Sequence, residues 1–206
     1  MRMSSPFVRA AATAGLCLVA AASAPREAHA QADAAHYTLT QQLSFVDGRD
    51  KPVSTADFEG KWLLVYFGYM HCADQCPWGL TVLGSALDML GPAARHLQPL
   101  FVTVDPERDR GQALLEFTAS FHERLVGLTG SEQQIRAAAE AMGVKFSRVQ
   151  QGADYAVDHS SSFSLVDPQR RRVITFREAE AHQVAARVVK VLTASGLKLE
   201  GVSAWR

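Results

Sequence analysis

Two cysteines four positions apart are the residues of this chain best suited to chemistry. Cys72 and Cys76 stand in the segment His71-Cys72-Ala73-Asp74-Gln75-Cys76-Pro77. A thiolate is both a nucleophile and a metal ligand, and the unpaired backbone N–H groups at a helix N-terminus lower the pKa of a thiol placed there. Residues four apart on a helix have Cα atoms roughly 6 Å apart, which permits a disulfide. The two sulfurs can therefore bond to each other or bind one metal ion.

A plain stabilising disulfide is the alternative for this pair. Such a bridge would close a very short loop, and because loop-closure entropy grows with loop length, it would add little stability. The third cysteine, Cys17, lies in a segment that we expect to be removed, so a scaffold of distant disulfides is not available. A redox or metal-binding role is therefore the favoured interpretation of Cys72 and Cys76.

The sequence around the cysteines predicts the elements that position them. Residues 62–69 form a continuous apolar, β-rich run, typical of a strand buried on both faces, and this run ends just before His71. After Pro77, leucines recur at helical spacing as far as Gly91: Leu80, Leu83, Leu87 and Leu90. Proline suits the first turn of a helix and glycine its end. We therefore expect Cys76 at the N-terminus of a long helix.

The rest of the chain alternates predicted strands and helices. We expect a hairpin over 39–50, a short helical turn over 54–60, strands over 100–104 and 125–128, helices over 111–121 and 131–142, a second hairpin over 163–176 and a helix over 178–193. Alternating strands and helices imply parallel βαβ units. The sequence thus predicts an α/β protein with a thioredoxin-like fold: a central mixed β-sheet flanked by helices, with an N-terminal β-hairpin.

The first thirty residues are typical of a secretory signal peptide. Arg2 and Arg9 form a positively charged N-terminal region, and an apolar run over 10–24 follows it. Ala28-His29-Ala30 then fits a signal-peptidase site. The run is shorter than the about 20 residues that a membrane helix needs. We expect residues 1–30 to be cleaved and residues 31–206 to form one exported domain, in the periplasm or at the outer face of the cytoplasmic membrane. An uncleaved membrane anchor is the alternative.

The composition excludes two classes of protein. The chain has 206 residues, 48% of them hydrophobic, with 21 basic and 21 acidic side chains. Without residues 1–30, which hold three arginines and one glutamate, 18 basic and 20 acidic side chains are left. This balance is typical of a folded protein rather than a disordered one, and it lacks the basic excess of a nucleic-acid binder.

Two sulfurs are an incomplete site for most metals, so a third donor is expected among the histidines. Residues 31–206 hold six of them: His36, His71, His96, His122, His159 and His182. Three lie in stretches predicted as polar or surface helix, where a solvated ring is expected, and His36 lies in the mobile beginning of the domain. His71 adjoins Cys72, but neighbours at a strand end point in opposite directions, so it is expected to shape the loop.

His159 differs from the others because it lies in a polar loop, residues 154–160, just before the second predicted hairpin. In a thioredoxin-like layout this loop comes close to the N-terminus of the first long helix. His159 is therefore either a hydrogen-bonded loop histidine or a third ligand. Two thiolates and an imidazole fit copper best, as Cu(I) or Cu(II), whereas zinc would need a fourth ligand or a water.

Three segments of the chain resemble, in order and spacing, the signatures of the SCO/SenC copper proteins. They are residues 66–77 (YFGYMHCADQCP), residues 103–109 (TVDPERD) and residues 155–160 (YAVDHS). This family consists of thioredoxin-like proteins implicated in assembling the copper centre of cytochrome c oxidase. The resemblance covers roughly residues 39–193. It departs from the family at Ala73, where many members have proline, and at Met70, where threonine is commoner.

The resemblance implies that Cys72, Cys76 and His159 bind copper and that the two cysteines also cycle between dithiol and disulfide. It places Asp105 and Asp109 in the second signature, where they are expected to cap the next helix and shape the rim of the site. Carboxylate oxygens match Cu(I) poorly, so they are not assigned as ligands. Asp158 is expected either to orient the His159 ring or to form a turn.

Two functions from different classes fit these residues. The first is a metallochaperone, not an enzyme, that passes copper by ligand exchange to an acceptor such as a cytochrome c oxidase subunit or to another copper chaperone. The second is a thiol-disulfide oxidoreductase, with Cys72 and Cys76 as catalytic residues, that reduces the acceptor's cysteines before copper is loaded. The second function needs both cysteines but has little use for His159.

Overall fold

The computed structural model describes residues 34–72 and 75–202, so the signal peptide predicted for residues 1–30 lies outside the described residues. Within the described ranges, no helix is long and apolar enough to cross a membrane.

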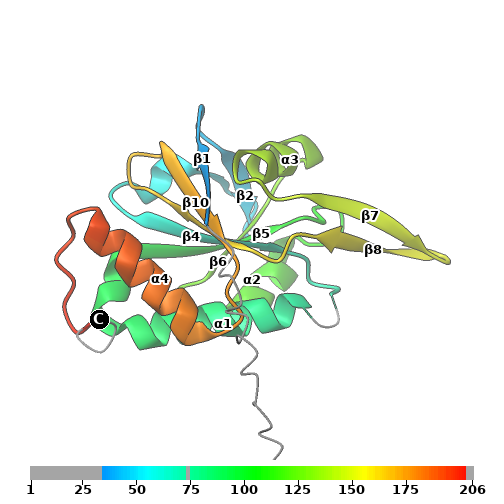
Figure 1. Ribbon diagram of the computed structural model, residues 1–206. Helices are drawn as coiled ribbons and strands as arrows, with labels where there is room; N and C mark the ends of the chain where they lie inside the picture. Colours follow the sequence, from blue (N-terminus) through cyan, green and yellow to red (C-terminus); the bar gives the residue numbers. More distant parts are fainter. Residues whose placement is uncertain (1–33, 73–74, 203–206) are drawn as a thin grey trace, which may run out of the picture. The chain divides into compact units, whose positions relative to one another are not determined.

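The core of the domain is an eight-stranded mixed sheet with the order β1-β10-β9-β4-β5-β6-β2-β3 (Figure 1). The parallel part consists of β4 (Trp62–Gly68), β5 (Leu97–Thr103) and β6 (Val126–Thr129). On the other side of β4, the antiparallel hairpin of β9 (Phe163–Val166) and β10 (Arg172–Phe176) extends the sheet. These strands confirm the predicted mixed sheet, with the apolar run at its centre.

The two edges of the sheet come from the N-terminal part of the domain. The predicted hairpin is confirmed as β2 (Ser44–Asp47) and β3 (Pro52–Ser54), followed by the helical turn η1 (Thr55–Phe58). At the opposite edge, β1 (Ala35–Thr38) pairs with β10. His36 lies in β1, so the expectation that it belongs to a mobile beginning is wrong.

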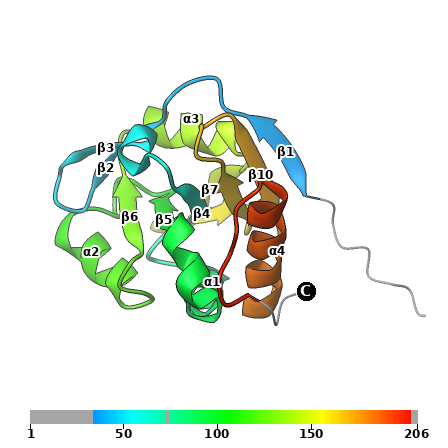
Figure 2. The same cartoon turned by 90° about the vertical axis from the view of Figure 1, so that its left-hand side faces the viewer.

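Helices cover both faces of the sheet (Figures 1 and 2). One face packs against α1 (Gln75–Leu90), α2 (Gly111–Ala119) and α4 (Ala181–Ala194), and the other packs against α3 (Glu132–Ala141). Successive side chains of β4 point to opposite faces: Trp62, Leu64 and Tyr66 to the first, and Leu63, Val65 and Phe67 to the second. A strand buried on both faces is why its sequence is apolar throughout. The short helix η2 (Gly91–His96) joins α1 to β5.

A separate two-stranded sheet is formed by β7 (Phe146–Gln151) and β8 (Asp154–His159), which pair with each other and not with the main sheet. Figure 1 shows this hairpin projecting beyond the main sheet. The expectation of a polar loop over residues 154–160 is therefore wrong for residues 154–159. Main-chain pairing with β7 makes this segment a strand although Val157 is the one residue of the six that is fully buried.

Candidate metal centre

The two cysteines lie where the central strand meets the first helix. Cys76 is in the first turn of α1 with its side chain fully buried, and Cys72 is half-buried in the preceding loop. Both are thiols in this structure. Cys76 thus lies at the helix N-terminus as predicted. Its backbone N–H donates a hydrogen bond to the Cys72 sulfur over 3.4 Å, which places that sulfur at the same helix end. A Cβ on Gly68, the last residue of β4, would lie 3.2 Å from the Cys76 sulfur, so glycine leaves room for it.

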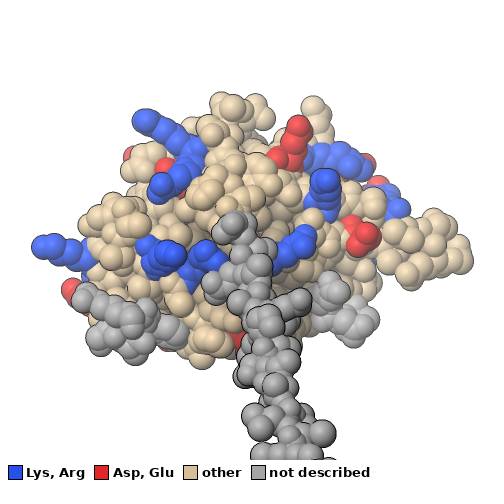
Figure 3. Space-filling model, in the orientation of Figure 1, with Lys and Arg blue, Asp and Glu red and all other residues tan. Residues whose placement is uncertain are grey.

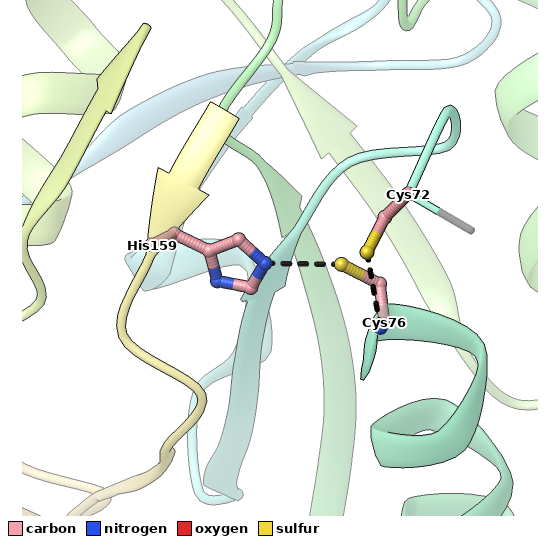
Figure 4. A group of neighbouring side chains, drawn as sticks. All are labelled: Cys72, Cys76 and His159. Atoms are coloured by element: carbon pink, nitrogen blue, oxygen red, sulfur yellow. Dashed lines mark hydrogen bonds between the residues drawn. The ribbon is translucent and has the colours of Figure 1, made fainter. Parts of the chain in front are cut away.

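His159 approaches the cysteines from the end of β8. Its Nε2 atom lies 3.0 Å from the Cys76 sulfur, and Figure 4 shows the ring pointing at that sulfur from the opposite side of the site. The Nδ1 atom lies 3.3 Å from the backbone carbonyl oxygen of Ser160, and Tyr69 meets the ring edge-on. Asp158 is exposed, so the group that orients the ring is the Ser160 carbonyl and not the Asp158 carboxylate.

The protonation chemistry of the buried cysteine differs from expectation. Burial raises the pKa of the Cys76 thiol far above its usual range, the Cys72 sulfur and Asp109 raise it further, and the backbone N–H of Tyr69 only partly offsets them. For Cys76, the expected lowering by the helix N-terminus is therefore outweighed by burial. Burial also lowers the pKa of His159, which keeps its imidazole neutral and able to bind a metal.

Asp109 holds the cysteine loop in place. It is fully buried, and its Oδ2 atom accepts hydrogen bonds from the backbone N–H of Met70 over 2.8 Å and from the Thr103 hydroxyl over 2.7 Å. Its Oδ1 atom lies 3.5 Å from Nδ1 of His71. Arg110, rather than Asp109, is the N-cap of α2, and it makes no side-chain capping bond. The expected helix-capping role of Asp109 is thus wrong, because its carboxylate faces the loop that leads to Cys72.

Asp105 holds the histidine strand in place. It is also fully buried, and it accepts hydrogen bonds from the Tyr155 hydroxyl over 2.8 Å and from Nε of Arg108. Arg108 in turn donates to the Tyr155 carbonyl and to the Asp154 carboxylate, and its guanidinium lies 3.9 Å from the centre of the Tyr155 ring. Asp105 therefore does not cap α2 either. The loop of residues 104–110 reaches both halves of the site.

Arg108 and Tyr155 were not candidate site residues in the sequence. The resemblance to the family could have pointed to them, because Arg108 lies in the segment 103–109 and Tyr155 in the segment 155–160. Spacing alone could not show that a guanidinium in one segment stacks on a phenol ring in the other.

Among the described residues, the other histidines do not join the cluster formed by Cys72, Cys76 and His159. His71 is more than half exposed and turns toward Asp109, which agrees with its expected role in shaping the loop. His182 is exposed, as expected. The expectation of solvated rings is wrong for the remaining two. His122 is mostly buried and accepts a hydrogen bond from the backbone N–H of Arg124, and His96 is half-buried.

The donor atoms fit a single soft metal ion. The two sulfurs and one ring nitrogen all lie within 4.8 Å of one another, and Figure 4 shows them facing a common point. Atoms bound to one ion at roughly 2.0–2.3 Å lie at most about 4.6 Å apart, so little movement would close the site. Two thiolates and an imidazole suit copper or zinc, and the carboxylates of Asp105 and Asp109 are engaged in hydrogen bonds elsewhere.

Comparison with known proteins shows the family to which this chain belongs. The SCO1/SenC family profile matches residues 31–194. A mitochondrial SCO2 homologue from Bos taurus is 42% identical over 130 residues, which cover 61% of this chain and 49% of the relative. This chain spans about half the length of curated relatives that it matches.

Two solved structures have the same fold. Arabidopsis thaliana ScoI, crystallised with copper bound, is 32% identical with a TM-score of 0.69, and the match covers 75% of this chain and 98% of that chain. Yeast Sco1, also crystallised with copper bound, is 33% identical with a TM-score of 0.68, and the match covers 76% of this chain and 90% of that chain.

Proposed function

Because the chain belongs to the SCO1/SenC family, we propose that it is a copper-binding metallochaperone that assists assembly of the copper centre of cytochrome c oxidase. The observation that carries the proposal is the convergence of Cys72, Cys76 and His159, whose donor atoms lie within 4.8 Å although His159 is 83 residues from Cys76 in the sequence. Copper bound to Arabidopsis ScoI and to yeast Sco1 supports copper as the cargo.

The burial of the three donors suits a carrier that must release its ion. Cys76 is fully buried, whereas Cys72 and His159 are half-buried and form the side of the site that an acceptor can reach. Each thiol gives up its proton when the ion binds and regains one when the ion leaves. An acceptor thiolate entering beside Cys72 and His159 would replace these ligands before Cys76, so that the ion is never fully solvated during transfer.

A copper titration tests the metal site. Reduced protein is titrated with Cu(I) against a competing chelator, for the wild type and for Cys72→Ser, Cys76→Ser and His159→Ala. Residues that only hold the ligands in place typically change metal affinity by about 10–100-fold. We expect each of these three substitutions to weaken copper binding by more than that. The matched control is His182→Ala, at an exposed histidine of α4 outside the cluster, which should keep its affinity within a few-fold. Unchanged affinity in the three ligand variants would remove the basis of the proposal.

We propose export for this protein, with residues 1–30 as a cleaved signal peptide and residues 31–206 as the working domain. The acceptor would be a copper-binding subunit of cytochrome c oxidase or another copper chaperone that faces the same compartment. Mass spectrometry of the protein recovered from the periplasm of a bacterial host tests this. We expect a mature chain that begins at Gln31, whereas a full-length chain in the membrane fraction would show that the N-terminus is an anchor.

The alternative function, a thiol-disulfide oxidoreductase, is supported by the unequal burial of two neighbouring thiols. The half-buried Cys72 thiolate would attack an acceptor disulfide, forming a mixed disulfide and releasing one acceptor thiolate. Cys76 would then attack the Cys72 sulfur and release the second, leaving a Cys72–Cys76 disulfide and an acceptor reduced by two electrons. An external thiol reductant would restore the dithiol.

Acceptor reduction by the His159→Ala variant distinguishes the two functions. Full reduction of an acceptor disulfide by a variant that no longer binds copper would favour the oxidoreductase. Failure of both the wild type and this variant to reduce the acceptor disulfide, although their two thiols react with a thiol reagent, would favour the metallochaperone.

A further inference from the structure

An apolar cleft lies beside the metal site. Its volume is about 560 Å³, and it is lined by Tyr66, Val82 and Phe163 from the sheet and α1, with Trp78 at its edge. Trp78 is 59% exposed, which makes it the most exposed large hydrophobic side chain among the described residues. Burial of a tryptophan ring against another protein removes a large apolar surface from water, which is favourable. An exposed tryptophan next to a cleft therefore indicates an interaction site.

This cleft is continuous with the surroundings of the metal ligands. Trp78 follows Cys76 by two residues, and Ser161, which also lines the cleft, follows His159 by two. A second hollow, of about 350 Å³, is lined by His159 itself, and Arg177 borders both. A protein that reached the metal site from the solvent side would therefore also meet the cleft.

The charges around the two hollows favour a binding partner with acidic side chains. Arg177 and Lys145 line them, both are exposed, and neither forms an ion pair with a residue that the structure describes. Glu178 is already paired with Arg187 over 2.8 Å, which leaves Asp158 as the one lining carboxylate without a basic partner in the described ranges. Figure 3 shows Lys and Arg side chains spread across the face on which α4 lies, with Asp and Glu side chains among them.

We propose that Trp78, Arg177 and the cleft between them form the docking surface for the protein that exchanges copper with this chain. The partner presents an apolar side chain, flanked by carboxylates, next to its own cysteines. The proposal rests on the proposed copper-carrier function and adds the chemistry of the partner. Tryptophan, tyrosine and arginine are the residues that most often dominate the energy of protein interfaces, and here they surround one cleft.

The two kinds of contact would act at different stages of the exchange. Opposite charges steer two proteins together and raise the association rate, and salt weakens this effect because the Debye length falls to about 8 Å at physiological ionic strength. The apolar side chain in the cleft would then hold the partner while its thiolates replace Cys72 and His159. We therefore expect Arg177 to affect the salt dependence of transfer and Trp78 to affect the lifetime of the complex.

Copper transfer to synthetic dithiol peptides tests the docking surface. The acidic probe carries two cysteines, an adjacent leucine and flanking glutamates, and the basic probe has lysine in place of each glutamate. Copper-loaded protein is mixed with each probe in a stopped-flow instrument. We expect transfer to the acidic probe to be at least about tenfold faster at low salt, with an advantage that shrinks as salt is added.

Variants assign the effect to particular residues. We expect Trp78→Ala to slow transfer to the acidic probe severalfold and Trp78→Phe to restore most of the rate. Arg177→Glu should remove or reverse the preference between the two probes. The matched controls are Met89→Ala, which removes an exposed side chain about 16 Å along α1 from Trp78, and Lys198→Glu, which changes a charge beyond the far end of α4. Both controls should behave as the wild type.

Copper affinity, measured separately for every variant, distinguishes failure of this inference from failure of the proposed function. A wild type that neither binds nor transfers copper would overturn the function itself. Normal copper binding, with Trp78→Ala and Arg177→Glu transferring copper at wild-type rates, would overturn the docking surface alone. Sedimentation should show a monomer. A dimer that Trp78→Ala abolishes would assign the cleft to a second copy of the chain and would also overturn the proposal.

Discussion

The carboxylate of Asp109 accepts a hydrogen bond from the backbone N–H of Met70, across 39 residues of sequence and two residues before Cys72. This bond ties the loop that carries the first cysteine to the end of β5. Asp105, four residues earlier, ties β8 and its histidine to the same loop through Tyr155. One short segment therefore sets the positions of both the sulfur and the nitrogen donors.

Asp109→Asn should weaken copper binding by about 10–100-fold, as expected for a residue that positions a ligand without touching the ion. Both hydrogen bonds reach Oδ2, and a neutral amide oxygen in its place is a weaker acceptor for the Met70 N–H and the Thr103 hydroxyl than a carboxylate oxygen is. The NH₂ group would then take the place of Oδ1, next to Nδ1 of His71. A shift of the thiolate-to-Cu(II) absorption band would show that the ligands have moved, which a purely global loss of stability would not cause. Asp88→Asn, at a carboxylate that is 78% exposed, is the control and should change neither.

Tyr155→Phe should lower the free energy of unfolding by about 1–2 kcal/mol, because it leaves one oxygen of the buried Asp105 carboxylate without its donor. Urea denaturation of the metal-free protein measures this. The comparison is Asp154→Asn, which removes the exposed partner of Arg108 and should cost less than about 1 kcal/mol. Equal effects of the two substitutions would argue against a stabilising role for the hydrogen bond between Tyr155 and Asp105.

Gly79→Ala should destabilise the protein by about 1–3 kcal/mol, although alanine is the better helix former. A Cβ at this position of α1 would lie 2.3 Å from the Tyr66 ring, which is itself buried in β4. Thermal unfolding of this variant and of Thr81→Ala, an exposed position in the same helix, separates close packing from helix propensity. A stabilised Gly79→Ala variant would show that Tyr66 can move aside at no cost.

The metal-free protein should become less stable as the pH falls from 7.5 to 5.5, in part through His96. Burial lowers the pKa of His96 below 6.5, and the nearby Arg95 and Lys61 lower it further. The unfolded chain therefore binds more protons than the folded one as the pH approaches 6.5 from above, and the free energy of unfolding decreases.

His96→Gln should reduce this decrease, which chelator-treated protein shows in urea denaturation at the two pH values. His182→Gln, at an exposed histidine, should leave the pH dependence unchanged. A His96→Gln variant with the full pH dependence of the wild type would assign the effect to other groups.

The elements that carry the cysteines could be predicted because their sequences are extreme. Every residue of β4 is buried, so the strand is apolar throughout, and the leucines of α1 mark one helix face between Pro77 and Gly91. The hairpin that carries His159 could not be predicted in the same way. Five of the six residues of β7 are exposed, so no alternation of polar and apolar residues marks it as a strand.

The clustering of Cys72, Cys76 and His159 could be predicted from the sequence, but the side chains that hold them in position could not. Asp105 and Tyr155 are 50 residues apart in the sequence, and only the folded chain shows that they form a hydrogen bond. The acidity of Cys76 was misjudged for a related reason. A helix N-terminus is visible in sequence, but the burial that dominates the pKa of this thiol is created by strands and loops from elsewhere in the chain.

The hairpin of β7 and β8 pairs only with itself, and this divides the site mechanically. Both sulfurs lie between β4 and α1 of the main sheet layer, whereas the ring nitrogen lies on a hairpin that Asp105, Arg108 and Tyr155 hold against the domain. Substitutions at these contacts can therefore weaken the binding of the ion while the domain stays folded, although they also lower its stability somewhat.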